Sequence, residues 1–279
     1  MPYPDSADQL LQEERRKNFL CGGLVTEIQQ ISQGIVLARE AVERQTKQML
    51  PADQAEIAPA LQDMDLCVRY LSYIAENLAD LTASGQGRLT PHWQPVELAW
   101  QYGQLVQLMN AGTAGPGRIA WSCTLAEGRF IQADEAWADK ILLNLLVNAL
   151  RYTGGPVRAS LAEQEQCLIL AVRDDGPGIS PGIQAQLFHP FEAEPLPDGA
   201  RHGVGLGLYL AREYSLAMSW QFDLQSGPEG TQVQLIIPLQ PETQEGAAGP
   251  AALRSHTRDL ALHTVQTKRV MAAASVLRL

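Results

Sequence analysis

The 279-residue sequence predicts an α+β protein in which an N-terminal antiparallel helical hairpin precedes a two-layer α/β sandwich. Two observations lead to this prediction. Residues 6–49 and 53–82 each repeat apolar residues at every third or fourth position, and Pro51 separates the two stretches. Residues 96–239 instead alternate short β-favouring runs with three helical stretches.

The predicted hairpin, residues 6–84, carries one apolar stripe on each helix. The stripes are Leu24, Ile28, Ile31, Ile35, Ala38 and Val42 in the first helix, and Leu61, Met64, Val68, Leu71, Ala75, Leu78 and Leu81 in the second. Packing the two helices together leaves an apolar edge, which a second copy would cover to form a four-helix bundle. We therefore expect a homodimer; the alternative is a monomeric hairpin folded onto its own second domain.

Residues 85–99 are predicted to be a linker because glycine and proline recur there. The sandwich domain then covers residues 96–239 and begins with a helix over residues 96–109. Its expected strands are residues 157–161, 168–172, 220–224 and 233–237. Residues 119–124 and 129–131 are expected to pair as a β-hairpin, and Asp134 is expected to cap the helix that follows.

Residues 168–172 are an apolar run that leads into Asp174 and two glycines, Gly176 and Gly178. Glycine adopts positive φ and allows close approach of a ligand, and Asp174 could accept a hydrogen bond from a ligand amino group. Taken alone, Asp-x-Gly-x-Gly is more often an ordinary turn than a binding site.

Two further stretches give this turn a context. In residues 142–153, Asn144, Asn148, Arg151 and Tyr152 share one face of a helix whose opposite face is rich in leucine. A plain amphipathic helix would explain this pattern, but two asparagines and an arginine suit a helix that lines a polar pocket. Residues 203–208, Gly-Val-Gly-Leu-Gly-Leu, open a further helix whose first amides could bind an anion.

Together with Phe188 and Phe191, these motifs occur in the order found in sensor histidine kinases, and residues 96–239 resemble the ATP-binding domain of that family. The resemblance implies binding of ATP and Mg²⁺, with Asn148 on the metal and Asn144 one turn before it. It implies that Arg151 and Tyr152 contact phosphate and the ribose or adenine edge, and that Asp174 accepts a hydrogen bond from the adenine amino group. The other residues that it places in the ATP site are Gly176, Gly178, Phe188, Phe191, Arg201, His202, Gly203, Gly205, Gly207 and Leu208.

Within this resemblance, Asn144 bears on the reaction. In ATP-hydrolysing relatives of the fold, a glutamate one turn before the magnesium asparagine activates water. An amide has no usable basicity near neutral pH, so Asn144 cannot act as that base. The site is therefore expected to hold ATP for transfer elsewhere, or to bind it only.

The hairpin also resembles the dimerisation hairpin of histidine kinases, but it departs from the family at the acceptor. A Phe-Leu pair at residues 19–20 leads to Val25 where the phospho-accepting histidine is expected. Valine cannot accept a phosphoryl group, and a structural role is expected for each of the five histidines of the chain. Self-phosphorylation in this hairpin is therefore not expected, whereas transfer to a partner's histidine stays open.

Composition limits the partners, metals and cellular location that we expect. The net charge of −10 argues against a nucleic-acid partner. Four dispersed cysteines without a Cys-x-x-Cys pair indicate a reducing compartment and argue against a zinc site. No apolar stretch of about 18 residues and no signal-peptide pattern are found, so we expect a soluble, cytoplasmic protein without a membrane span. Residues 240–279 form a basic tail, either poorly ordered or a helix that docks on an anionic surface.

Three functions fit these observations. The first is a dimeric histidine-kinase-like protein of two-component signalling that works with a partner kinase or a response regulator. The second is a kinase that phosphorylates another protein, as the anti-sigma kinases of the same fold do on serine. The third is a non-catalytic scaffold that changes shape when it binds ATP.

Overall fold

A computed structural model describes residues 6–47, 51–112, 118–126, 128–153, 155–184, 186–191 and 205–239. The chain divides between Leu89 and Thr90 into two compact units. In the described ranges, no helix combines the length and the apolar character that a membrane crossing requires.

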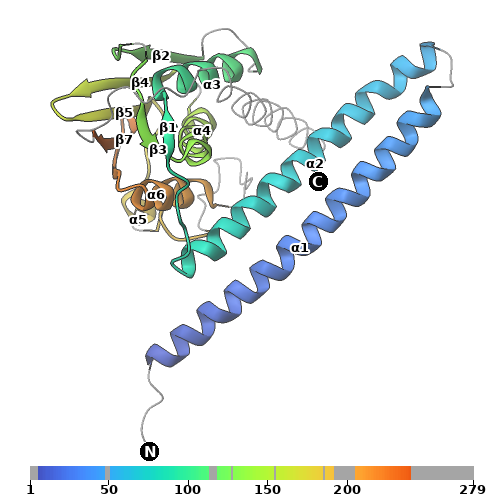
Figure 1. Ribbon diagram of the computed structural model, residues 1–279, viewed down its shortest axis with the longest axis horizontal. Helices are drawn as coiled ribbons and strands as arrows, with labels where there is room; N and C mark the ends of the chain where they lie inside the picture. Colours follow the sequence, from blue (N-terminus) through green and yellow to red (C-terminus); the bar gives the residue numbers. More distant parts are fainter. Residues whose placement is uncertain are drawn as a thin grey trace, which may run out of the picture. The chain divides into compact units, whose positions relative to one another are not determined.

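The first unit is a pair of antiparallel helices, α1 (Ser6–Thr46) and α2 (Pro51–Gly85), which run side by side (Figure 1). Pro51 is the first residue of α2, where its missing N–H group is not needed for an intrahelical hydrogen bond. The apolar stripe predicted for α1 is divided in the structure. Ile28 and Ile35 are half-buried, whereas Leu24, Ile31 and Val42 are 40–53% exposed.

The second unit is built on a five-stranded sheet (Figure 1). The strand order is β2 (Ile119–Cys123), β4 (Val157–Gln164), β5 (Cys167–Asp174), β7 (Gly230–Pro238) and β6 (Gln221–Gly227). All neighbours are antiparallel except β2 and β4, which are parallel.

The expected β-hairpin between residues 119–124 and 129–131 is wrong. β2 pairs with β4, while β3 (Ile131–Ala133) pairs with β1 (Gln94–Val96), a strand within the segment predicted to be a linker. Pairing with β4 sets the buried Ile119 beside the buried Val157 and so extends the apolar face of the sheet. A parallel pair needs a long crossover, which the chain between β2 and β4 supplies.

The helical layer consists of α3 (Leu98–Gly112), α4 (Glu135–Tyr152) and α6 (Gly207–Ala217), with the short α5 (Pro181–Gln184) outside the predicted set. The sheet buries alternate residues against this layer. Leu170, for example, lies between Leu161 and Leu235 in the register, and all three are completely buried. This two-layer arrangement confirms the predicted fold class.

The start of α4 is as predicted. Asp134 is the N-cap residue, and its Oδ1 accepts a hydrogen bond of 3.0 Å from the backbone N–H of Trp137. Its Oδ2 accepts a second bond of 2.8 Å from the N–H of His92. Asp134 therefore connects the entry of the second unit to the helix that carries the two asparagines.

Candidate nucleotide site

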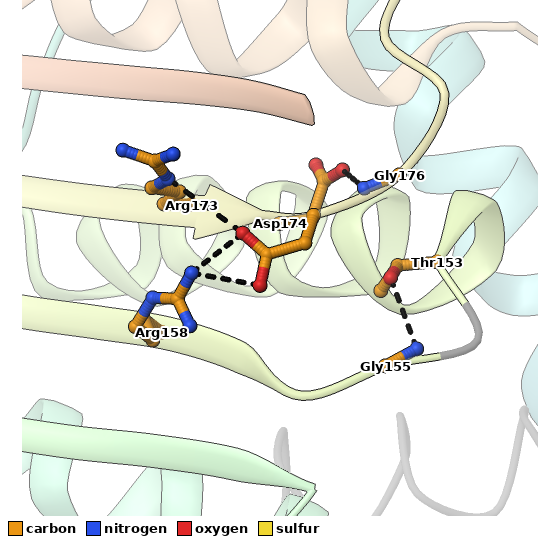
Figure 2. A network of polar contacts seen from close by, with 7 residues as sticks. Thr153, Gly155, Arg158, Arg173, Asp174 and Gly176 are labelled. Carbon is orange, nitrogen blue, oxygen red and sulfur yellow. Dashed lines mark hydrogen bonds and ion pairs between the residues drawn. The ribbon is translucent and has the colours of Figure 1, made fainter. Parts of the chain in front are cut away.

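Asp174 is the last residue of β5, and its carboxylate is on the helix-facing side of the sheet with Leu168, Leu170 and Val172. It is 7% exposed. Its Oδ1 accepts a hydrogen bond of 2.8 Å from the N–H of Gly176 (Figure 2). Burial raises the pKa of Asp174 above its ordinary value, and backbone hydrogen bonds from Gly176 and Thr231 partly oppose that rise. A carboxylate is thus held in a mostly apolar layer by backbone donors.

The two glycines after Asp174 are required by close contacts. A Cβ atom on Gly176 would lie 2.7 Å from Asp174 Oδ1 and 2.9 Å from the carbonyl oxygen of Tyr152. Gly178 has φ +72°, and a Cβ atom there would lie 2.0 Å from the carbonyl oxygen of Gly227. The turn is therefore packed against the end of α4 on one side and against the β6–β7 turn on the other.

The asparagine face of α4 meets the start of α6. Asn144 is 4% exposed, and a Cβ atom on Gly207 would lie 2.9 Å from its Oδ1. Asn148, one turn later, is half-buried. The two helices are further joined by the stacked rings of Trp137 and Tyr214, whose centroids are 5.0 Å apart.

The start of α6 is flanked by glycine and has no side-chain cap. Gly205 has φ +73°, α6 begins at Gly207, and the N-cap position is Leu206, whose apolar side chain caps no amide. Leu206 is buried and Leu208 is half-buried. Backbone amides at such a helix start are suited to anionic groups.

Phe188 packs against one residue of β6 and one of α6. Its ring meets Phe222 edge to face at 5.7 Å between centroids, and the guanidinium of Arg212 lies 5.0 Å from its centroid. Phe191 is 47% exposed and has φ +68°. These contacts give Phe188 a packing role between β6 and α6.

The predicted site residues divide into those that the structure describes and those outside the described ranges. Arg201, His202 and Gly203 lie outside the described residues, and so does the side chain of Arg151. The structure brings together five of the predicted residues from three separate stretches of sequence: Asn144, Tyr152, Asp174, Gly176 and Gly207. Asp174 and Gly176 contact the Tyr152 end of α4, and Gly207 contacts Asn144 on the same helix.

Sequence reasoning missed three contributors to this region. Ser226 Oγ accepts a hydrogen bond of 2.8 Å from the N–H of Ile179, and Gly227 lies against Gly178. Arg118 donates hydrogen bonds to carbonyl groups at the end of α4. The Ser-Gly-Pro sequence at residues 226–228 signalled a turn, but no local pattern indicates which loop a turn will contact.

Asp175, the residue that follows β5, is exposed and forms an ion pair. It accepts hydrogen bonds of 2.5 and 2.7 Å from Nη2 of Arg158, which lies opposite Arg173 in the β4–β5 register (Figure 2). The neighbouring carboxylates Asp174 and Asp175 therefore differ sharply: one is buried and bonded to backbone, and the other is exposed in an ion pair.

The sequence of the second unit matches a known protein family. Residues 133–241 match the family described as histidine kinase-, DNA gyrase B-, and HSP90-like ATPase. Residues 133–241 form an ATPase domain of the sensor histidine kinase type.

Relatives of this chain include a bacterial sensor protein and two bacterial histidine kinases. The chain is 40% identical over 96 residues to the sensor protein RstB of Escherichia coli, covering 34% of the chain and 22% of RstB. It is 29% identical over 190 residues to the histidine-protein kinase AfsQ2 of Streptomyces coelicolor, covering 66% of the chain and 34% of AfsQ2. It is 30% identical over 191 residues to the cell-division control histidine kinase PdhS of Brucella canis, covering 64% and 18%. The chain thus spans about a third or less of the length of these relatives.

Solved structures show the same fold. Full-length ShkA in complex with AMPPNP superimposes with a TM-score of 0.57 at 22% identity, over 83% of this chain and 47% of ShkA. The histidine kinase AdeS of Acinetobacter baumannii gives a TM-score of 0.51 at 18% identity, over 76% of this chain and 94% of the AdeS chain. The ATPase domain and the helical hairpin together therefore have the fold of histidine kinases.

Proposed function

We propose that the protein binds Mg²⁺-ATP in the ATPase domain and works in two-component signalling by phosphoryl transfer to a partner protein. The observation that carries this proposal is the buried carboxylate of Asp174, held by the N–H of Gly176 at the end of a strand whose other buried residues are apolar. Burying a carboxylate among apolar residues is costly, and a hydrogen bond from the adenine amino group would offset part of that cost.

The surrounding residues fit the rest of the nucleotide. A Cβ atom at Gly176, Gly178 or Gly207 would collide with Tyr152, Gly227 or Asn144, respectively, so glycine lets these elements pack closely around the proposed site. The first amides of α6 would bind phosphate oxygens. The amide oxygen of Asn148 would hold Mg²⁺, an ion that prefers oxygen ligands and is commonly shared with phosphates. Mg²⁺ would neutralise charge on the phosphates during transfer.

Phosphoryl transfer to another chain is proposed because the residue needed for ATP hydrolysis and the residue needed for self-phosphorylation are both replaced. Asn144 replaces the glutamate that activates water in hydrolysing relatives, and Val25 replaces the acceptor histidine. In the structure Val25 is a half-buried residue of α1. A histidine of a partner kinase, or a side chain of another target, would then receive the phosphoryl group.

A dimer through the hairpin is part of this proposal. Leu24, Ile31 and Val42 lie at helical spacing on one face of α1 and are 40–53% exposed. A second hairpin would cover this face in a four-helix bundle. Light scattering should show a dimer that Ile31→Glu dissociates. Leu37→Glu is the matched control, because Leu37 is 59% exposed on another face of α1.

The nucleotide site is tested by calorimetric titration with Mg²⁺-ATP. Asp174→Asn keeps an oxygen for the N–H of Gly176 but presents a donor to the adenine amino group, and should weaken binding by roughly tenfold to a hundredfold. Asp175→Asn is the control, because that carboxylate is exposed and pairs with Arg158. Equal affinity of the wild type and Asp174→Asn would contradict the proposal.

Transfer is tested with γ-labelled ATP. We expect label on an added partner kinase or response regulator and none on this chain alone. Label on the isolated chain would show self-phosphorylation at a residue other than Val25. Nucleotide binding with no transfer to any partner would favour a scaffold that responds to ATP.

A further inference from the structure

Arg118, the residue before β2, forms hydrogen bonds to the C-terminal end of α4, the helix that carries Asn144 and Asn148. Its Nη2 donates hydrogen bonds to the carbonyl oxygens of Leu150 at 3.1 Å and Thr153 at 2.9 Å. The last four carbonyl groups of a helix have no intrahelical partner, and a cation is favoured at that end of the helix dipole. One guanidinium therefore satisfies two of the groups that α4 leaves open.

The backbone around Arg118 is itself fixed by two other elements. Its carbonyl oxygen accepts a bond of 2.8 Å from the N–H of Val157, the first residue of β4. The side chain of Asn110 in α3 brackets the next residue: its Oδ1 accepts from the N–H of Ile119 at 3.0 Å, and its Nδ2 donates to the carbonyl of Ile119 at 2.9 Å. The Arg118 guanidinium thus reaches α4 from a backbone that hydrogen bonds to β4 and α3 hold in place.

The helix end that Arg118 holds forms one wall of the proposed site. The carbonyl oxygen of Tyr152, between the two bound carbonyls, lies against Gly176 so closely that a Cβ atom there would be 2.9 Å away. Gly176 in turn donates to Asp174. Beyond the helix, the N–H of Thr153 bonds to Ala149 and its Oγ1 accepts from Gly155 (Figure 2). A shift of this turn would therefore move Tyr152 relative to Asp174.

We propose that Arg118 is a positioning residue for nucleotide binding. It holds the last turn of α4 against Gly176, and so fixes the separation between Asp174, which would bind adenine, and Asn148, which would bind the metal. Arg118 itself contacts no nucleotide in this arrangement. The proposal rests on the proposed function, because it concerns the affinity for Mg²⁺-ATP.

The test compares Arg118→Ala, Arg118→Lys and the control Arg129→Ala in nucleotide titrations and urea unfolding. Arg129 forms an exposed ion pair with Glu163 at 3.0 Å and should not affect binding. We expect Arg118→Ala to raise the Kd for Mg²⁺-ATP by roughly tenfold in protein that is still folded, since two charged hydrogen bonds are lost. Arg118→Lys keeps the charge and one donor, so it should fold and bind with a Kd between those of Arg118→Ala and the wild type.

The outcomes distinguish a positioning role of Arg118 from a purely structural one, and distinguish failure of this proposal from failure of the proposed function. If the alanine variant lowers the urea midpoint but both variants keep the wild-type Kd, Arg118 is only structural and this proposal is overturned. If the alanine variant does not fold, the lysine variant decides, because an unchanged Kd there has the same meaning. If the wild type binds no ATP, the proposed function fails as well. If Asp174→Asn loses binding and neither folded Arg118 variant does, only the role of Arg118 is rejected.

Discussion

Gly207 lies directly against Asn144: a Cβ atom on Gly207 would come within 2.9 Å of the amide oxygen Oδ1. This contact joins the first residue of α6 to the buried face of α4. It also explains why a helix of 11 residues begins with glycine, although alanine is the better helix former.

Gly207→Ala should separate binding from stability. Alanine gains up to about 1 kcal/mol in helix propensity, while the added methyl group must displace the Asn144 side chain. We expect the free energy of unfolding to change by no more than about 1 kcal/mol, and the Kd for Mg²⁺-ATP to rise roughly tenfold. Gly103→Ala in α3 is the control, since its nearest atom would be Trp121 Nε1 at 3.5 Å. A normal Kd for Gly207→Ala would show that Asn144 has no part in the site.

Gly178→Ala should destabilise the ATPase domain. A left-handed backbone costs a non-glycine residue about 1–2 kcal/mol, and the new methyl group would meet the carbonyl of Gly227 at 2.0 Å. We expect the free energy of unfolding to fall by roughly 2–4 kcal/mol in urea titrations. Gly182→Ala, in α5 with no atom within 4 Å of the added group, should change it by less than about 1 kcal/mol. Similar losses in both variants would disprove the argument from backbone contact.

The stability of the ATPase domain should depend on pH through Asp139. Burial, and then the charge of Glu135, raise the pKa of this carboxyl from 3.8 to about 7, against the hydrogen bond from Gln101 Nε2 at 2.6 Å. The folded state therefore favours the protonated acid. That contribution is fully present below pH 3.8 and is lost as the pH rises to about 7.

Asp139→Asn should remove this dependence. Between pH 5.5 and pH 8, the wild type should lose roughly 2 kcal/mol of unfolding free energy relative to the variant, at about 1.4 kcal/mol per pH unit up to the folded pKa. Urea unfolding at the two pH values measures the difference. Asp223→Asn, at an exposed position, should give parallel changes with the wild type. A constant difference between the wild type and Asp139→Asn would rule out a raised pKa for Asp139.

Arg212 and Phe188 should be energetically coupled. The guanidinium lies 5.0 Å from the ring centroid, which is within the range of a cation–π contact. A double-mutant cycle with Arg212→Leu and Phe188→Leu should give a coupling of about 0.5–1 kcal/mol in unfolding free energy. Replacing Phe222, which also contacts Phe188, gives a second cycle for comparison. Additive effects of Arg212→Leu and Phe188→Leu would mean that the contact contributes nothing.

The sequence was informative where a local pattern has one physical explanation. Asp174 followed by Gly176 and Gly178 predicted a tight turn after a strand, and Asp134 predicted the start of α4; both are present. The asparagine face of α4 was also readable, because helical period alone places Asn144 and Asn148 together.

Other features depend on contacts that the sequence does not encode locally. Gly178 needs to be glycine because of Gly227, which comes from a different hairpin. Arg118 and Asn110 look like ordinary surface residues in sequence, and only the fold brings Arg118 to the end of α4. The β-hairpin expected for residues 119–131 failed for the same reason: nearby β-favouring runs were assumed to pair, but each found a distant partner.

The parallel pairing of β2 with β4 has a consequence for how the protein is made. β2 stands at the sheet edge, and its partner is synthesised only after α4. Pairing over such a sequence separation requires closure of a long loop, which folding reaches late. A nascent chain that ends before Val157 therefore contains α4 but lacks β4, the strand with which β2 pairs. Ribosome-bound fragments should consequently gain protease resistance only once residues 157–164 have emerged.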